Sequence, residues 1–259
     1  MTRHGGQLLV DSLVALGATR AFGVPGESYL AVLDGLHDTA GRLDFVNCRN
    51  EGGAAFMAAA WGKLTGQPGI CMVTRGPGAT NASIGVHTAM QDSSPMILLV
   101  GQIGTQMRGR EAFQEVDYKA VFGTMAKWAV EVDEAARLPE ILARAWKTAL
   151  TGRPGPVVID VPKNIQQTRA QVLFPDEVDI PGFDPEGLKA SELELNEIVG
   201  LIEKSERPLL YVGGGIISAD ASDALRRLVA ATGIPVTSTI MGVGAFPETH
   251  ELSLRWLGM

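Results

Sequence analysis

The sequence predicts an α/β protein built on a parallel sheet with helices on both faces. Apolar segments of strand length alternate with segments of helical spacing, and glycine or proline separates them. The segment 42–48 alternates, but the apolar runs as a set are too continuous for strands covered on one face, which is typical of parallel sheets covered on both faces. The pattern predicts one such domain over 1–167, a linker over 168–192 and the start of a second α/β domain over 193–259.

The elements of the first domain follow in order along the chain. We expect strands at 20–26, 42–48, 68–74, 95–101, 126–132 and 155–162. We expect helices at 6–17, 28–37, 52–64, 79–90 and 138–150. Ser28 is suited to cap the second of these helices, and Gly66 is suited to end the third.

The second part of the chain, from residue 168, has a different sequence pattern. Residues 168–192 contain three prolines and scattered acids without a period, so they are interpreted as a linker. Helices are expected at 193–204 and 219–233, and strands in "RPLLYVGGG" and "IPVTSTI". Because two strands cannot close a core of their own, we expect a truncated domain and a piece of a longer protein.

Composition excludes several function classes. Of the 259 residues, 46% are hydrophobic and 20% charged, as in an ordinary soluble globular protein. Apolar runs stay shorter than the roughly 20 residues of a membrane helix, and the first residues do not form a signal sequence, so we expect a cytoplasmic protein without a membrane partner. A net charge of −7 without a basic cluster argues against nucleic acid. Cys48 and Cys71 are interpreted as buried, reduced thiols on neighbouring strands.

Four loops follow predicted strands, where parallel sheets collect their ligands. They are "GVPGES", "RNEGG", "TRGPGATN" and "GQIGTQ". Their glycines and short polar groups let a flat ligand approach the backbone, although helix packing selects glycine as well. "TRGPGATNAS" also has the form of an anion cradle, but it lacks the lysine of a Walker loop. "YVGGGIIS" is better interpreted as a tight turn than as a dinucleotide site.

Metal and hydrolase sites are not predicted from these residues. The four histidines are far apart in the sequence, and there is neither a C-x-x-C pair nor a G-x-S-x-G elbow. Glu51 is the notable acid, because Gly52, Gly53, Ala54 and Ala55 follow it and the strand before it is expected to be buried. It could simply offset a helix dipole. A carboxyl group in an apolar place also tends toward a raised pKa, which suits proton exchange with a nitrogen heterocycle.

Five segments together resemble a known family. They are "FGVPGE", "RNEGGAAFMAAAWGKLTGQPGICMVTRGPGATN", "SPMILLVGQ", "EAFQEVD" and "RPGPVVIDVPKNIQQ". In this order and spacing they resemble thiamine-diphosphate enzymes of the acetolactate synthase group. "LLYVGGGI" and "LRWLGM" resemble the Rossmann-like central domain of that family.

The resemblance implies a 2-keto acid decarboxylase or carboligase, with branched-chain amino acid biosynthesis as one setting. Glu51 then matches the glutamate that hydrogen-bonds the pyrimidine ring and promotes ylid formation, and Gln114 matches a glutamine at the reacting centre. Lys163 matches a lysine at the substrate channel, with a solvated loop lysine as the alternative. Residues that would frame the pyrimidine site are Pro25, Gly26, Thr74, Gly76, Pro77, Gly78 and Asn81.

The resemblance also implies further cofactors and partners. Mg²⁺ is expected to bind a diphosphate domain that this chain lacks, since there is no Gly-Asp-Gly with a distant asparagine. FAD would lie against "YVGGG" in a true acetolactate synthase. The family's active sites lie between subunits, so we expect a homodimer or homotetramer, and the 259 residues alone should bind the cofactor poorly and not turn over.

Two departures from the family pattern bear on specificity. The family commonly has Arg-His-Glu where this chain has Arg49-Asn50-Glu51, and proline and arginine where it has Gly104 and Gln106. Glyoxylate carboligase, oxalyl-CoA decarboxylase and sulfoacetaldehyde acetyltransferase share the scaffold and stay open as alternatives. Two rivals lie outside catalysis: a silent nucleotide- or flavin-binding module, and a dimerisation subunit that contributes half a site.

Overall fold

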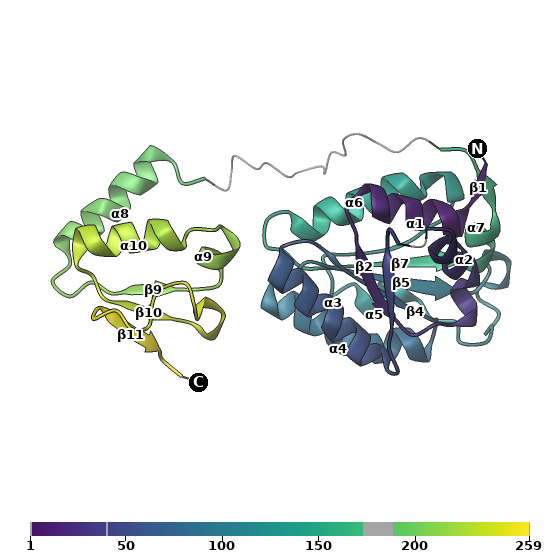
Figure 1. Cartoon of the computed structure of the whole chain (residues 1–259), viewed down its shortest axis with the longest axis horizontal. Helices are drawn as coiled ribbons and strands as arrows, with labels where there is room; N and C mark the ends of the chain where they lie inside the picture. Colours follow the sequence, from purple (N-terminus) through teal and green to yellow (C-terminus); the bar gives the residue numbers. More distant parts are fainter. Residues whose placement is uncertain (1, 40, 173–188, 259) are drawn as a thin grey trace. The chain divides into compact units, whose positions relative to one another are not determined.

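A computed structural model describes residues 2–39, 41–172 and 189–258. The chain divides into two compact units, Met1–Phe183 and Asp184–Met259, which are described separately (Figure 1). Most of the predicted linker, residues 173–188, lies outside the described residues. None of the described helices is long and apolar enough to cross a membrane.

The first unit is built on a six-stranded sheet in the order β3-β2-β4-β5-β7-β6. All of its neighbouring strands run parallel, which confirms the predicted fold class. The strands are β2 (Arg20–Gly23), β3 (Asp44–Asn47), β4 (Gly69–Val73), β5 (Met96–Gln102), β6 (Trp128–Glu131) and β7 (Pro156–Pro162). A short antiparallel pair, β1 (Arg3–His4) with β8 (Arg169–Ala170), lies apart from this sheet.

Helices cover both faces of the six-stranded sheet. The helices are α1 (Gly5–Ala15), α2 (Leu30–Asp38), α3 (Glu51–Thr65), α4 (Pro77–Asp92), α5 (Tyr118–Phe122), α6 (Leu138–Leu150) and α7 (Lys163–Gln167). One apolar core packs α1, α2 and α6 on one face, and a second packs α3, α4 and α5 on the other (Figure 1). The central strands β4, β5 and β7 are buried along their whole length, as their continuous apolar sequences predict.

The small residues of α3 allow an unusually close approach to its neighbours. A Cβ placed on Gly85 of α4 would lie 2.4 Å from the Cβ of Ala55. A Cβ on Gly62 would lie 2.0 Å from the Pro95 carbonyl oxygen, and one on Gly69 would lie 1.8 Å from the carbonyl oxygen of Ala58. The alanine- and glycine-rich sequence therefore serves close packing of α3 on α4 and on the sheet.

Two local expectations are wrong. Ser28 does not cap a helix, because the chain first forms a 3₁₀ turn, Glu27–Tyr29, and the buried Ser28 hydroxyl hydrogen-bonds Thr74 Oγ1 at 2.7 Å. The two cysteines do not lie on neighbouring strands, because β2 separates β3 from β4. Cys71 is buried and free, and its burial raises the pKa of its thiol, whereas Cys48 is free and only half-buried.

The second unit holds a three-stranded parallel sheet in the order β11-β10-β9. Its elements are α8 (Glu192–Lys204), β9 (Leu210–Val212), α9 (Gly215–Ser218), α10 (Ser222–Thr232), β10 (Val236–Ser238) and β11 (Ser253–Trp256). Strand β11 corrects the expectation of only two strands. It pairs with β10, and the sheet and α10 enclose a small core that includes Val229, Val236 and Phe246.

Candidate functional site

The four loops singled out in the sequence meet at one edge of the main sheet. They follow Gly23 of β2, Asn47 of β3, Val73 of β4 and Gln102 of β5. Because these strands are parallel neighbours, their carboxyl ends face the same way. This edge is the position at which open parallel sheets bind ligands.

Glu51 is the first residue of α3, directly beyond the carboxyl end of β3. The side chain of Asn50 caps this helix by accepting a hydrogen bond from the Gly53 amide at 3.1 Å. The amide of Asn81 on α4 donates to Glu51 Oε2 at 3.0 Å. The carboxylate is thus fixed between the first turn of α3 and the facing side of α4.

The surroundings of Glu51 differ from those expected from the sequence. Strand β3 is an edge strand of the described sheet and is only partly buried, and Glu51 itself is half-buried. From the sequence we expect the strand before Glu51 to be buried. The place of β3 at the edge of the sheet instead leaves its side chains partly exposed. The Glu51 carboxylate is therefore accessible from the surface of this chain.

Glycines allow the segments beside Glu51 to pack closely. A Cβ on Gly78 would lie 2.9 Å from Thr74 Cγ2 and 3.5 Å from Glu51 Oε1. A Cβ on Gly26 would lie 2.5 Å from the Cβ of Thr74. Five predicted site residues therefore form a row of neighbours. Gly26 lies beside Thr74, Gly78 lies beside both Thr74 and Glu51, and Asn81 hydrogen-bonds Glu51.

Gln114 lies on the other side of the same turn. Gly76 has φ = 60° and ψ = −114°, a conformation that residues with a side chain rarely adopt, and a Cβ there would lie 2.7 Å from the Cβ of Gln114. Gln114 also has a positive φ of 65°. The turn 76–78 therefore lies between Gln114 and Glu51. The predicted residues Pro25 and Pro77 are exposed, Pro25 in the loop after β2 and Pro77 at the first position of α4.

Sequence reasoning missed a charged cluster at this edge, formed by Glu27, Arg75 and Lys163. Glu27 forms ion pairs with Arg75 and with Lys163 Nζ, the latter at 3.2 Å. These partners lower the pKa of Glu27, chiefly through the hydrogen bond from Arg75. Lys163, the predicted channel lysine, is the first residue of α7 beyond β7. An arginine at a strand end, directly before Gly-Pro-Gly, was the available signal.

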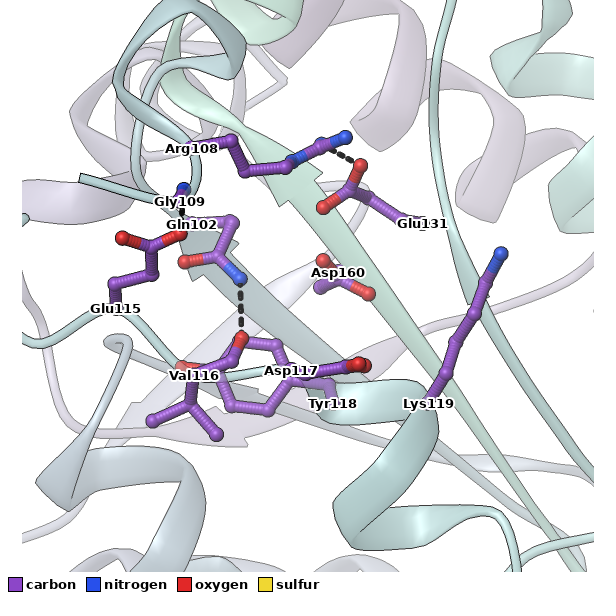
Figure 2. A pocket seen from close by; sticks show the side chains of 10 residues that line it. All are labelled: Gln102, Arg108, Gly109, Glu115, Val116, Asp117, Tyr118, Lys119, Glu131 and Asp160. Atoms are coloured by element: carbon purple, nitrogen blue, oxygen red, sulfur yellow. Dashed lines mark hydrogen bonds and ion pairs between the residues drawn. The ribbon is translucent and has the colours of Figure 1, made fainter. Parts of the chain in front are cut away.

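A cavity of about 320 Å³ lies beside the site (Figure 2). It is lined by Gln102, Arg108, Gly109, Glu115, Val116, Asp117, Tyr118, Lys119, Glu131 and Asp160. Asp160 on β7 is only 2% exposed, and this burial raises the pKa of its carboxyl group to about 7. Arg108 forms an ion pair with Glu131 across the cavity, as Figure 2 shows. An aspartate within the apolar "VVIDVP" was the sequence signal for this buried acid.

Tyr118 connects this cavity to the glycine turn. Its ring lines the cavity, and its hydroxyl accepts a hydrogen bond from the Gly76 amide at 2.7 Å. Burial raises the pKa of Tyr118 to about 12, so the hydroxyl stays protonated at neutral pH. Through this hydrogen bond, Tyr118 stabilises the position of Gly76.

Comparisons with known proteins identify the family of the chain. Residues 3–121 match the family described as "Thiamine pyrophosphate enzyme, N-terminal TPP binding domain", and residues 195–259 match "Thiamine pyrophosphate enzyme, central domain". The chain thus belongs to the thiamine pyrophosphate enzymes. All of the predicted site residues except Lys163 lie within the first match.

Within this family, the chain is similar to acetolactate synthase large subunits. It is 39% identical over 255 residues to that of Corynebacterium glutamicum and 37% identical over 257 residues to isozyme 3 of Escherichia coli. A probable acetolactate synthase large subunit of Methanocaldococcus jannaschii is 39% identical over 258 residues. Each match covers 98% of this chain but only 40% to 44% of the relative. The chain therefore spans less than half the length of these relatives.

Proposed function

We propose that the protein acts in a thiamine-diphosphate-dependent decarboxylase or carboligase of 2-keto acids, with the aminopyrimidine ring of the cofactor bound beside Glu51. The observation that carries the proposal is the Glu51 carboxylate, held by Asn81 at 3.0 Å at the carboxyl edge of a parallel sheet. An acid that served only to offset a helix dipole would not need a dedicated amide partner.

The residues beside Glu51 fit such a ring. A Cβ at Gly78 would lie 3.5 Å from Glu51 Oε1, so glycine lets a ring come closer to this oxygen than a larger residue would. Oε2 accepts from Asn81, which leaves Oε1 to share a proton with a ring nitrogen. When bound, thiamine diphosphate supplies the electron sink that carries a 2-keto acid through loss of carbon dioxide.

The chain's own residues have separate roles in this proposal. Glu51 holds or gives up a proton at Oε1, and Asn81 fixes its direction. Gln114, positioned by its contact with Gly76, offers an amide to the substrate. Lys163 contributes positive charge toward an anionic substrate.

The partners and further cofactors belong to the same proposal. Large apolar side chains are exposed on α3 and α4. Phe56 and Met57 lie within two helical turns of Glu51, Leu64 lies at the far end of α3, and Ile84 lies on α4. These exposed side chains support a homodimer or homotetramer in which a second subunit covers the cofactor. Mg²⁺ would bind the diphosphate outside the residues described here. FAD, a role in branched-chain amino acid synthesis and a cytoplasmic location also stay predictions.

The test is an assay of the full-length gene product with thiamine diphosphate, Mg²⁺ and a panel of 2-keto acids, following carbon dioxide release. We expect turnover, and we expect Glu51→Gln to reduce kcat/KM by about a hundred- to ten-thousandfold. Glu140→Gln, which removes a surface carboxylate on α6, is the matched control and should match wild type. A wild-type protein that binds the cofactor but releases no carbon dioxide would favour the silent binding module instead.

A further inference from the structure

Three charged residues meet beyond the carboxyl ends of three different strands. Glu27 follows β2, Arg75 follows β4 and Lys163 follows β7. One carboxylate is shared between two cations, with Oε1 toward Arg75 and Oε2 toward Lys163. The cluster therefore keeps one formal positive charge in excess.

The two cations are held in different ways. The Arg75 side chain is only 9% exposed, donates from Nε to the Phe113 carbonyl oxygen at 2.9 Å and lies over the Phe113 ring. Its backbone amide also donates to Ser28 Oγ at 3.2 Å. A guanidinium that is fixed and nearly buried requires a counter-charge, because leaving such a charge unpaired is strongly unfavourable.

Glu27 is the exposed partner of Arg75 in this cluster. Its side chain is 56% exposed and that of Lys163 is 44% exposed. Ion pairs between such exposed side chains contribute little and exchange readily with other ions. The position that the Glu27 carboxylate occupies can therefore be taken by another carboxylate without loss of the counter-charge for Arg75.

We propose that Arg75 and Lys163 form a binding site for the carboxylate of a small 2-keto acid, and that Glu27 occupies this site as an internal competitor. The inference rests on the proposed function for the identity of the ligand. The planar fork of Arg75 matches a carboxylate group, and Lys163 adds a point charge. Glu27 thus sets the substrate concentration at which the site fills.

Removing the competitor should strengthen anion binding. Pyruvate is titrated at constant ionic strength into the 259-residue chain, and its Kd is taken from the rise in Tm with ligand concentration. We expect Glu27→Gln to lower the Kd about fivefold, the factor that corresponds to one half-exposed ion pair. Methyl pyruvate, which lacks the carboxylate, should show no such gain, and Glu140→Gln should behave as wild type.

Lys163→Gln provides a second variant that does not remove the counter-charge of Arg75. We expect it to raise the Kd for pyruvate at least twofold, because one of the two cations is lost. The proposal is overturned if Glu27→Gln leaves the pyruvate Kd within twofold of wild type or raises it, or if methyl pyruvate gains equally. Circular dichroism of each variant verifies folding.

The full-length protein separates this inference from the proposed function. If it turns over pyruvate but Glu27→Gln does not lower KM, the carboxylate site is wrong and the function stands. If it acts on none of the 2-keto acids while Glu27→Gln still tightens pyruvate binding, the function is wrong and the carboxylate site stands.

Discussion

Two acids lie beyond or near the carboxyl edge of the same sheet, in opposite environments. Glu51 follows the edge strand β3, is half-buried and receives a hydrogen bond from Asn81. Asp160 lies within the central strand β7, is 2% exposed and faces a cavity of about 320 Å³. From the sequence we expect Glu51 to be the buried carboxyl group, but in the structure the buried one is Asp160.

The comparison shows that burial and reactivity need not coincide in one carboxyl group. Burial raises the pKa of Asp160 to about 7, yet its surroundings are charged side chains that already pair with one another, such as Arg108 with Glu131. Glu51 is accessible from the surface, and Gly78 lies beside its Oε1. The proposed catalytic acid is therefore distinguished by its access to a ligand and not by its burial within this chain.

The largest expected effect is on activity. In the full-length protein, Glu51→Gln should lower kcat/KM about a hundred- to ten-thousandfold, whereas Asp160→Asn should stay within about tenfold of wild type. The reason is that only Glu51 is proposed to exchange a proton with the cofactor. Equal losses in the two variants, measured as carbon dioxide release from 2-keto acids, would remove the distinction between the two acids.

The second effect concerns stability and pH. The pKa of Asp160 rises from 3.8 in the unfolded chain to about 7 in the folded protein, so the folded state binds the extra proton between these values. Its contribution to stability is therefore present below pH 4 and is lost as the pH rises toward 7. Asp160→Asn should remove this dependence and be more stable than wild type at pH 8, by on the order of 3 kcal/mol.

Urea unfolding of both proteins at pH 4.5, 6 and 8 measures this difference. Because the chain contains further titrating groups, the difference between variant and wild type at each pH is the quantity compared. A difference that does not change with pH would mean that Asp160 is not the titrating group.

A third effect tests the link between the two regions. Tyr118→Phe removes the hydroxyl that accepts from the Gly76 amide, and a buried amide left unpaired costs about 1–3 kcal/mol. We expect lower stability by that amount and weaker thiamine diphosphate binding in the full-length protein, because the turn 76–78 loses its support. Tyr211→Phe is the matched control, since Tyr211 is exposed on the second unit.

The smallest effect concerns the helix that presents Glu51. Asn50→Ala removes the side-chain cap of α3 and should lower the free energy of unfolding by about 1 kcal/mol. Asn50→Asp keeps a capping oxygen and should therefore retain most of the free energy of unfolding that the alanine variant loses. An alanine variant as stable as wild type in urea would show that Asn50 stands at this position for another reason.

The fold was largely predictable because its elements are local and strongly periodic. The helix Leu138–Leu150 has the predicted bounds, and each of the six strands of the main sheet overlaps a predicted segment. Two of the wrong expectations, that β3 is buried and that Cys48 and Cys71 lie on neighbouring strands, concern strand order, which local pattern does not encode. Neither the edge position of β3 nor the separation of Cys48 from Cys71 follows from the residues of those strands.

The candidate site was predictable only in part. The loops carrying Glu51, Gly76 and Gly78 have motif-like sequences, and the parallel sheet brings them to one edge. The Glu27 cluster depends on Lys163, which is 136 residues away in the sequence, and on side-chain directions that spacing does not reveal. Strand β11 was missed because its residues are mostly exposed and do not form an apolar run.

The close packing of α3 on α4 determines the distance between Glu51 and Asn81. Glu51 begins one of these helices and Asn81 lies near the start of the other, so their mutual distance depends on the separation of the helix axes. That separation depends on the missing methyl group at Gly85, where a Cβ would lie 2.4 Å from the Cβ of Ala55, about one helical turn from the carboxylate. A single added carbon atom at Gly85 would move the two partners apart without touching them.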